Sequence, residues 1–300
     1  MKAAITNYAK DILKIDAIGF SPAEILTADL SNYHKFLQEK NYGDMYWLQT
    51  RQLLRDNPKQ LLPQANSAII IGLNYFNVKP IKDYEISIYA NQLQDYHLWV
   101  YKKVQTLAKF LNTTYQDTNR YFVDSAPLLE KTLAKYTQIG WQGKHTCIVS
   151  KEFGSWLFLG VILTSLQLPA DTPHKNLCGT CTKCIDACPT KALSPYKIQV
   201  NKCISYYTIE HKTDIPKELQ SKFGKKVFGC DACLQACPFN KWQKVSKHQA
   251  SSYNPQFPTT LQDFIKLDQN NFNQIFKNTP LRRTGFSRLM RNIAIISNNE

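Results

Sequence analysis

Residues 178–189 read Cys-Gly-Thr-Cys-Thr-Lys-Cys-Ile-Asp-Ala-Cys-Pro, which spaces four cysteines as C-x2-C-x2-C-x3-C-P. Bacterial iron-sulfur ferredoxins use this spacing, because its short intervals let one loop bring thiolates to several iron atoms of a cluster. Structural zinc sites also contain C-x2-C pairs, so a pair of zinc sites is the alternative interpretation. Three closely spaced cysteines followed by x3-C-P favour iron-sulfur clusters.

A partial second copy of the motif lies at residues 230–238, where three cysteines precede a proline. Val227 stands where a first cysteine belongs, and Cys203, upstream, is the candidate for the missing ligand. In two-cluster ferredoxins the cysteine before the proline binds the opposite cluster. This crossed pattern predicts two 4Fe-4S clusters, one on Cys178, Cys181, Cys184 and Cys237 and the other on Cys188, Cys203, Cys230 and Cys233.

The ninth cysteine, Cys147, lies in a predicted strand and is interpreted as a small buried hydrophobe. An odd cysteine count and a charged N-terminal segment without an apolar core argue against a secreted disulfide scaffold. We therefore expect reduced thiols and a cytoplasmic protein. The apolar stretches 68–76 and 156–168 are too short or too interrupted to span a membrane, so no membrane association is expected.

The charge of the 300-residue chain is uneven: its net charge is +14, and residues 171–300 contribute +10 of it. A basic surface of this kind suits a polyanionic partner such as nucleic acid. Residues 168–173, Leu-Pro-Ala-Asp-Thr-Pro, read as a break between two parts. We predict a domain at 1–170, a ferredoxin-like domain with two clusters at 171–245, and a basic helical segment at 246–300.

Hydrophobic periodicity indicates helices and strands in the first part, and therefore an α+β fold with a mixed α/β first domain. No Gly-x-Gly-x-x-Gly or P-loop motif signals a nucleotide site. Predicted helices cover the opening segment to about residue 18, then 30–38, 95–111, 128–139 and 259–296. Predicted strands cover 67–76, 120–123 and 147–149.

Several longer motifs occur in order along the chain: Val-Asp-Ser-Ala-Pro-Leu-Leu-Glu-Lys from residue 123, Gly-Trp-Gln-Gly-Lys-His-Thr from 140, Gly-Ser-Trp-Leu-Phe-Leu-Gly from 154, and Cys-Ile-Ser-Tyr-Tyr-Thr-Ile-Glu from 203. Together with the cysteine loop they resemble the epoxyqueuosine reductase family. The resemblance implies a cobalamin-dependent iron-sulfur enzyme, with cobalamin in the first domain. It also implies reduction of epoxyqueuosine to queuosine at the tRNA wobble position, with electrons from an external low-potential donor.

The resemblance assigns Asp124 as the catalytic proton donor and a cofactor contact. Read from the residues alone, Asp124 or Ser125 could instead cap the helix that starts near Pro127. A donor has to hold a proton at the working pH, so we expect the cofactor pocket to raise the pKa of Asp124 by desolvation.

The remaining candidate cofactor contacts are His97, Lys144, His145, Thr146, Ile148, Ser155 and Trp156. By resemblance, the residues after the Gly-Trp-Gln-Gly turn help to frame the corrin ring. From the residues alone, Lys144 could be a solvated charge and Trp156 a core residue. His97 could be a lower cobalt ligand or an ordinary hydrogen-bonded histidine, and the resemblance implies base-off cobalamin without a histidine on cobalt.

The candidate tRNA contacts are basic residues of the second part: Lys212, Arg282, Arg283, Arg288 and Arg291. A solvated helix face is the alternative for the arginines. The family often has Gly at the place of Ala126 and Asn at that of His145, and many members continue into a helical-repeat domain. We expect a monomer whose tRNA contacts rely on the basic surface.

Two other functions remain open at this level. Reductive dehalogenases resemble this family in combining cobalamin with two ferredoxin-type clusters, and they act on small organohalides. An electron carrier with a basic docking surface would need no pocket acid, but it leaves the first domain unexplained. The basic charge and the absence of an export signal favour tRNA as the substrate.

Overall fold

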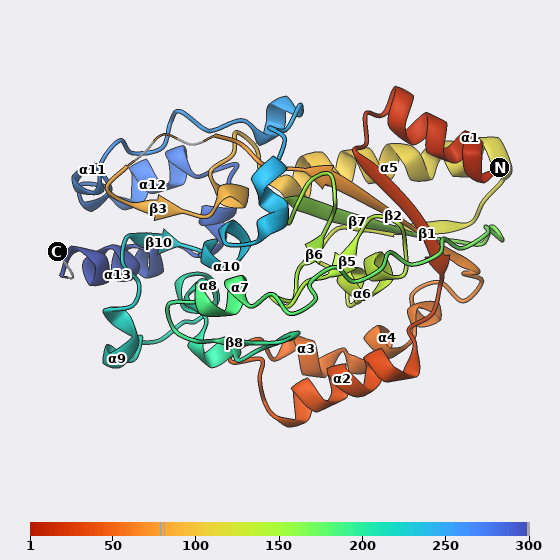
Figure 1. Cartoon of the computed structure of the whole chain (residues 1–300). Helices are drawn as coiled ribbons and strands as arrows, with labels where there is room; N and C mark the ends of the chain where they lie inside the picture. The colour runs from red at the N-terminus through yellow and green to blue at the C-terminus, as the bar shows by residue number, and fades with distance from the viewer. Residues whose placement is uncertain (79, 81, 299–300) are drawn as a thin grey trace.

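The computed structural model describes residues 1–78, 80 and 82–298, and its centre is a four-stranded antiparallel sheet (Figure 1). The strands lie in the order β1 (Ala17–Pro22), β2 (Ser67–Asn74), β7 (Leu157–Thr164) and β4 (Asn119–Phe122). Every residue of β2 is buried, since its run Ala-Ile-Ile-Ile-Gly-Leu has apolar side chains toward both faces. This strand therefore requires cover on both sides.

Helices supply that cover. On one face α5 (Tyr96–Tyr115) packs Val104, Leu107 and Leu111 against the sheet, together with α1 (Lys2–Asn7) and the π-helical turn η1 (Tyr8–Ile12). On the other face lies α6 (Glu130–Lys135), whose buried Leu133 belongs to the same core as Val161. The arm formed by α2 (Thr27–Gln38), α3 (Trp47–Thr50), α4 (Gln52–Asp56) and η2 (Pro58–Gln60) lies beside this second face (Figure 1).

Most predicted elements of the first domain are confirmed. β2 and β4 coincide with the predicted strands, β6 (Ile148–Val149) pairs with β5 (Trp141–Gln142), and α2, α5 and α6 lie within or around the predicted helices. The prediction of one opening helix to residue 18 is wrong, because Lys14 takes a left-handed φ of 53° and β1 begins at Ala17. The apolar stretch after Trp156 is a central strand, β7, which is not among the predicted strands.

The cysteine loops carry short helical turns. α7 (Lys183–Asp186) and α10 (Ala232–Gln235) follow the first cysteines of their motifs and contact each other. Around them lie the hairpin β8 (Leu193–Ser194) and β9 (Lys197–Ile198), with η4 (Val200–Lys202), α8 (Ile204–Ile209), α9 (Lys217–Gln220), β10 (Lys226–Phe228) and η5 (Pro238–Trp242). The turns between cysteines thus bring the two loops side by side.

The C-terminal helices form a core that also takes in a segment of the first domain. The predicted helical region contains α11 (Leu261–Ile265), α12 (Gln269–Ile275), η7 (Pro280–Arg283) and α13 (Phe286–Ser297), preceded by η6 (Gln249–Ser251). Residues 84–90, which include β3 (Glu85–Ile86) and η3 (Ile88–Ala90), pack among them, and β3 pairs in parallel with β10. A helix long and apolar enough to cross a membrane does not occur among the described residues.

Candidate active site and cluster-binding loops

Electrostatic interactions connect the cysteine thiols in two sets. Burial, and then the thiols of Cys237, Cys178 and Cys181, raise the pKa of Cys184, which places these four thiols within electrostatic reach of one another. The grouping brings Cys237 from the second motif to the first loop. It agrees with the crossed arrangement expected from the spacing, while ligation by these residues stays a prediction.

The second group is linked in the same way. Burial and then Cys188 raise the pKa of Cys203, and burial and the Cys203 thiol contribute to the raised pKa of Cys230. The pKa of Cys233 is raised by burial and by Cys147, Cys230 and Cys203. Within residues 1–78, 80 and 82–298, no cluster of three or more His, Cys, Asp or Glu side chains has an arrangement that could bind a metal ion.

Lys144 anchors the first cysteine loop. Its Nζ donates hydrogen bonds to the carbonyl oxygens of Gly179, at 2.7 Å, and Cys181, at 2.9 Å, and only 8% of the residue is exposed. Hydrogen bonds from a charged donor are stronger than neutral ones. The residue that the resemblance placed at the corrin ring is thus engaged with the loop that carries the first cysteines.

His145 lies between the first domain and the Cys237 loop. Burial opposes its protonation, but hydrogen bonds with the thiols of Cys147 and Cys237 raise its pKa to about 9. Its Nε2 lies 3.2 Å from Ser155 Oγ. The neighbouring Thr146 takes a left-handed φ of 71°, and Ile148 is buried in β6. The loop predicted to frame the cofactor therefore contacts the cysteine domain directly.

A tight contact joins this loop to η5. The Ser155 amide donates to Asn240 Oδ1 at 2.8 Å. Gly154 adopts a φ of +57°, and a Cβ at this position would lie 1.7 Å from the same Asn240 oxygen. Only glycine satisfies both conditions, so the sequence Gly-Ser-Trp sets how closely β7 approaches the Cys237 loop.

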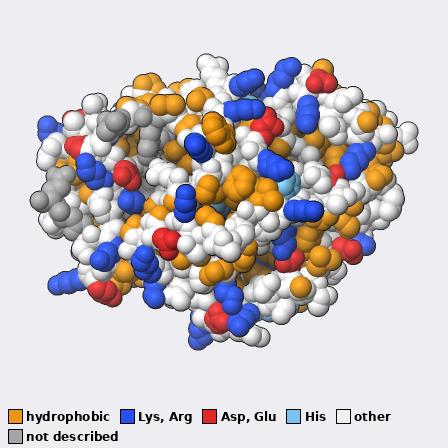
Figure 2. Space-filling model, in the orientation of Figure 1, with side chains coloured by type: hydrophobic (Ala, Val, Ile, Leu, Met, Phe, Trp, Pro, Cys, Tyr) orange, Lys and Arg blue, Asp and Glu red, His pale blue; other side chains and the backbone are white. Residues whose placement is uncertain are grey.

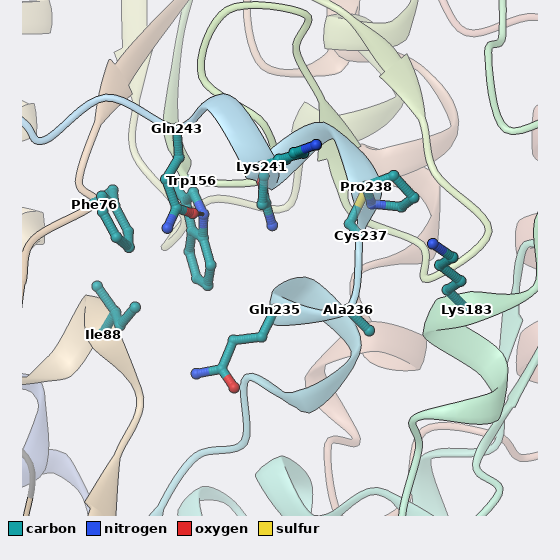
Figure 3. A pocket seen from close by; sticks show the side chains of 11 residues that line it. Phe76, Ile88, Trp156, Lys183, Gln235, Ala236, Cys237, Pro238, Lys241 and Gln243 are labelled. Carbon is teal, nitrogen blue, oxygen red and sulfur yellow. Dashed lines mark hydrogen bonds between the residues drawn. The ribbon is translucent and has the colours of Figure 1, made fainter.

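A cavity of about 540 Å³ separates the sheet domain from the cysteine loops (Figure 3). Phe76, Ile88 and Trp156 form an apolar wall, and the Trp156 indole N–H donates to Gln243 Oε1 at 2.6 Å. The other lining residues come from α7, α10 and η5: Lys183, Gln235, Ala236, Cys237, Pro238, Asn240, Lys241 and Gln243. Of the predicted cofactor contacts, Trp156 lines this cavity.

Asp124 follows β4 in a left-handed conformation, with a φ of 57°. Its Oδ2 accepts a hydrogen bond from the Tyr96 hydroxyl at 2.8 Å and lies 3.2 Å from His97 Nε2. Its backbone N–H donates to Glu130 Oε1 at 2.8 Å, while 52% of its side chain is exposed. Unusual backbone geometry held by surrounding contacts is common at functional sites.

The cap interpretation of this segment is wrong. α6 begins at Glu130 behind Leu129, which makes no capping hydrogen bond, so neither Asp124 nor Ser125 occupies the cap position. Glu130 instead reaches back to the Asp124 amide. The carboxylate of Asp124 instead contacts Tyr96 and His97 on α5.

The expectation that this site raises the pKa of Asp124 is also wrong. The hydrogen bond with His97 is the largest influence and, with that from Tyr96, it outweighs desolvation and lowers the pKa to about 2. The pKa values of two neighbours are raised. Burial lowers the pKa of His97, but its carboxylate partners outweigh burial and raise it to about 9. Burial, and then the charge of Asp124, raise the pKa of Glu130 to about 8. The resting site therefore contains an ionised Asp124 beside a protonated His97.

His97 has a carboxylate at each ring nitrogen, with Asp95 Oδ1 2.7 Å from Nδ1 and Asp124 at Nε2. Both ring nitrogens are thus engaged with carboxylates, as expected for the alternative of an ordinary hydrogen-bonded histidine.

Rings connect the Asp124 network to the cavity. Tyr96 stacks on Phe158 with ring centroids 4.3 Å apart, and Phe158 stacks on Tyr75 at the same distance. Tyr75 in turn meets the edge of Trp156 at 5.8 Å. Sequence reasoning missed Tyr96 and Glu130 as site residues, although Glu130 lies inside the motif that begins at Val123 and Tyr96 stands between Asp95 and His97.

The predicted tRNA contacts fall into two kinds. The guanidinium of Arg288 donates to the carbonyl oxygens of Ile209 and Glu210, and that of Arg291 to those of Tyr207, His211 and Thr213. These two arginines complete the C-terminal end of α8. Arg283 pairs with Glu210 at 2.9 Å, and Arg282 and Lys212 are exposed. Figure 2 shows Lys and Arg side chains around the apolar centre of one face.

Two protein-family models match parts of the chain. Residues 177–240 match a family model described as a 4Fe-4S double cluster binding domain, and residues 55–125 match one described as Epoxyqueuosine reductase QueG, DUF1730. The second model ends one residue after Asp124. The cysteine part is thus a double-cluster 4Fe-4S domain, which excludes the zinc interpretation.

Whole-chain relatives agree with both models. The chain is 35% identical to the epoxyqueuosine reductase of Leadbetterella byssophila, over 97% of this chain and 98% of that protein. It is 34% identical to that of Escherichia coli K12, over 94% of this chain and 78% of the other. A crystal structure of epoxyqueuosine reductase with an epoxyqueuosine-modified tRNA-Tyr stem loop superimposes with a TM-score of 0.87 at 26% identity, covering 99% of this chain and 81% of the other. The structure from Streptococcus thermophilus gives 0.86 at 26%, covering 100% and 81%. The chain belongs to the epoxyqueuosine reductase family.

Proposed function

We propose that the protein reduces epoxyqueuosine in tRNA to queuosine, with Asp124 delivering a proton to the epoxide oxygen. The observation that carries this proposal is a partly exposed carboxylate in a left-handed backbone conformation, whose amide donates to Glu130. Its partner Tyr96 is connected through stacked rings to Trp156 in the wall of the cavity at the Cys237 loop. Family membership supplies the substrate class. Two electrons and two protons convert the epoxide to an alkene and release its oxygen as water.

Two 4Fe-4S clusters supply the electrons in this proposal, on the crossed sets of cysteines named above. The two thiol groups lie on neighbouring loops, since α7 and α10 are in contact. An external low-potential donor reduces the clusters. His145, next to Cys237, and Lys144, on the carbonyls of the first loop, hold the cluster domain against the sheet domain.

Cobalamin fits the cavity by the chemistry of the lining. Trp156 and Phe76 offer flat apolar surfaces for a ring system, and the side chains of Gln235, Asn240 and Gln243 offer hydrogen-bonding partners for peripheral amides. When bound, cobalamin supplies a cobalt centre that accepts single electrons from clusters and makes them available at a carbon–oxygen bond. Of the other predicted contacts, Ser155, Thr146 and Ile148 belong to the loop beside this cavity.

The chain's own residues position the acid. Tyr96 and His97 fix the carboxylate of Asp124 from the N-terminal end of α5, and Glu130 fixes its backbone from α6. Orientation of an acid within hydrogen-bonding reach of the leaving oxygen is what general acid catalysis requires.

For the tRNA, we propose that the exposed Arg282 and Lys212 contact phosphates, with Arg283 beside them. We further propose a monomeric cytoplasmic protein with a cofactor domain at 1–170, a cluster domain at 171–245 and a tRNA-contacting helical segment at 246–300. The basic excess of residues 171–300 supports this division.

The test is an anaerobic assay of reconstituted protein on tRNA containing epoxyqueuosine, with and without added cobalamin. Nucleoside mass spectrometry measures queuosine after digestion. We expect queuosine only in the arm with cobalamin. Intact clusters with no queuosine in either arm would refute the proposed function, and queuosine formed equally in both arms would refute the cobalamin assignment.

A further inference from the structure

The acid assigned to the reaction does not hold a proton in the resting site. Hydrogen bonds from His97 and Tyr96 stabilise the Asp124 carboxylate and keep its pKa near 2. A carboxylate in this state can act as an acid only after it has received a proton from a neighbour. The neighbour has to touch Asp124, carry a proton at neutral pH and exchange protons with water.

His97 meets these conditions by position. Its Nε2 lies 3.2 Å from Asp124 Oδ2, and its Nδ1 lies 2.7 Å from Asp95 Oδ1. The imidazole therefore lies between two carboxylates. The His97 side chain is 31% exposed to solvent. A buried histidine without water access could not be recharged between turnovers.

We propose that His97 is the proton-supplying residue of the active site: it passes a proton to Asp124, and Asp95 keeps the imidazole charged and oriented. This inference rests on the proposed function, because Asp124 must be the group that reaches the epoxide oxygen. His97 acts through Asp124 and is a positioning and supplying residue.

The location of His97 explains why Asp95 is needed. His97 lies in the first turn of α5, where the helix dipole disfavours a cation. Asp95 is the N-cap of that helix, and its Oδ1 accepts from the His97 amide at 3.0 Å as well as meeting the ring. Tyr96 stacks on the imidazole with centroids 4.0 Å apart, which fixes the ring plane. The Asp95 carboxylate thus caps α5 and also compensates the positive charge of His97.

As a carbon–oxygen bond of the epoxide breaks, His97 passes its proton to Asp124 and Asp124 passes a proton to the epoxide oxygen, while two electrons come from the reduced clusters. His97 then takes another proton from water. A second pass of the same relay provides the second proton, and the oxygen leaves as water with the alkene formed.

Other titratable groups surround the relay and must be separated from His97 in any test. Glu130 is the main competitor, because its pKa of about 8 also lies on the alkaline side. The charged or titratable groups facing the Asp95, His97 and Asp124 line are Tyr89, Tyr96, Glu130, Lys131, Arg283 and, behind Lys131, Cys147.

The experiment measures single-turnover rates of the reduced holoenzyme on modified tRNA between pH 6 and pH 9.5. For each variant the quantity compared is the ratio of its rate at pH 6 to its rate at pH 8.5. Asp95→Asn keeps the capping oxygen but removes the charge that raises the His97 pKa. We expect its ratio to exceed the wild-type ratio by about threefold, because loss of a carboxylate partner lowers the His97 pKa by about one unit from about 9.

Two controls make the result specific. Glu130→Gln keeps the carbonyl that accepts from the Asp124 amide but cannot titrate, so a fall in rate at alkaline pH that persists in this variant does not come from Glu130. His97→Gln should lose most of the rate at every pH, about a hundredfold, and its profile should lack the alkaline limb. Absorption spectra and tRNA affinity verify that each variant retains its cofactors and substrate binding.

The outcomes distinguish this inference from the proposed function. If Asp124→Asn is inactive but Asp95→Asn has the wild-type ratio, His97 does not supply the proton and the inference is overturned. A normal rate in His97→Gln overturns it as well. If Asp124→Asn turns over normally, the proposed role of Asp124 fails first, and the inference falls with it.

Discussion

Glu130 shows how burial and one neighbouring charge decide the state of a side chain. Its pKa is raised to about 8, first by burial and then by the Asp124 carboxylate. In the unfolded chain a glutamate ionises near pH 4.5, so the folded state binds the extra proton between these two values. The stability that this proton contributes is present in full below about pH 4.5 and is lost as the pH rises through about 8.

Glu130→Gln should therefore remove part of the pH dependence of stability. We expect the apparent Tm of the wild type to fall more between pH 5 and pH 8 than that of Glu130→Gln, measured by thermal scans of the holoprotein. Glu152→Gln is the matched control, because Glu152 forms an exposed ion pair with Lys244. Equal Tm changes in all three proteins would contradict the protonated state of Glu130.

Lys144 allows a second test at the scale of one residue. Lys144→Met removes two charge-assisted hydrogen bonds to the first cysteine loop, which together stabilise it by about 2 kcal/mol. We expect at least tenfold faster loss of about half the bound iron to a chelator. Lys183→Met, in the same loop but with an exposed side chain, should lose iron at the wild-type rate. Equal rates for the two variants would contradict the anchoring role.

Among single residues, the sequence predicted types and spacing better than partners. The eight cysteines of the double-cluster domain and the aspartate after β4 follow from motifs. The low pKa of Asp124 could not be foreseen, because it depends on Tyr96 and His97, which reach it across the fold from another element. The contacts of Lys144 could not be foreseen for the same reason, because the carbonyl oxygens of Gly179 and Cys181 that it binds belong to a loop 35–37 residues further along the chain.

At the scale of elements, the arginines of η7 and α13 are of two kinds: some donate hydrogen bonds to backbone carbonyls, and others face solvent. Arg291 donates to the carbonyl of Tyr207 in the last turn of α8 and to those of His211 and Thr213 in the loop that follows, whereas Arg282 is exposed. A helix end with unpaired carbonyls is costly when it is buried. The arginines therefore have two different roles, one in stability and one at the surface, and the sequence alone could not predict which arginine has which role.

This division predicts opposite behaviour for two variants. Arg291→Met should lower the free energy of unfolding by about 2–3 kcal/mol, because the carbonyls lose their partner. Arg282→Met should leave stability unchanged and weaken tRNA binding about threefold to tenfold. Denaturant titrations and filter binding measure the two quantities. Reduced stability in Arg282→Met with unchanged tRNA affinity would reverse the assignment.

Elements with clear periodicity were predictable, and those with mixed composition were not. α5 and β2 have long apolar patterns and were expected at their observed places. β1 was missed because Gly19 and Ser21 interrupt its pattern, and its strand character comes from pairing with β2. Gly19 is required there, since a Cβ would lie 2.5 Å from the Thr137 side chain.

At the scale of the whole molecule, the basic excess of residues 171–300 predicts how tRNA affinity responds to salt. Each phosphate contact releases counterions, so the logarithm of the affinity should fall linearly with that of the salt concentration. With about three contacts we expect a loss of roughly tenfold or more between 50 and 200 mM salt. Filter binding across this range is the measurement, and an affinity independent of salt would exclude a surface built on phosphate contacts.

The two-part division of the chain was only partly predictable from sequence. Composition changes near residue 170, as the cysteine and charge counts show. Residues 84–90, however, lie on the far side of that boundary and pack with the C-terminal helices. Their partners are long-range in sequence, and local composition contains no signal for such pairing.

The pairing of β3 with β10 has a consequence for biosynthesis. Lys226 lies opposite Glu85, so β3 waits for about 140 further residues before its partner leaves the ribosome. At about 5–20 residues per second this takes roughly 7–30 s, during which Ile86 and Tyr84 lack their native cover. The first cysteine loop is synthesised within this interval, and the second, at residues 230–237, follows β10 directly. Nascent chains stalled before α13 would expose this apolar segment to chaperones.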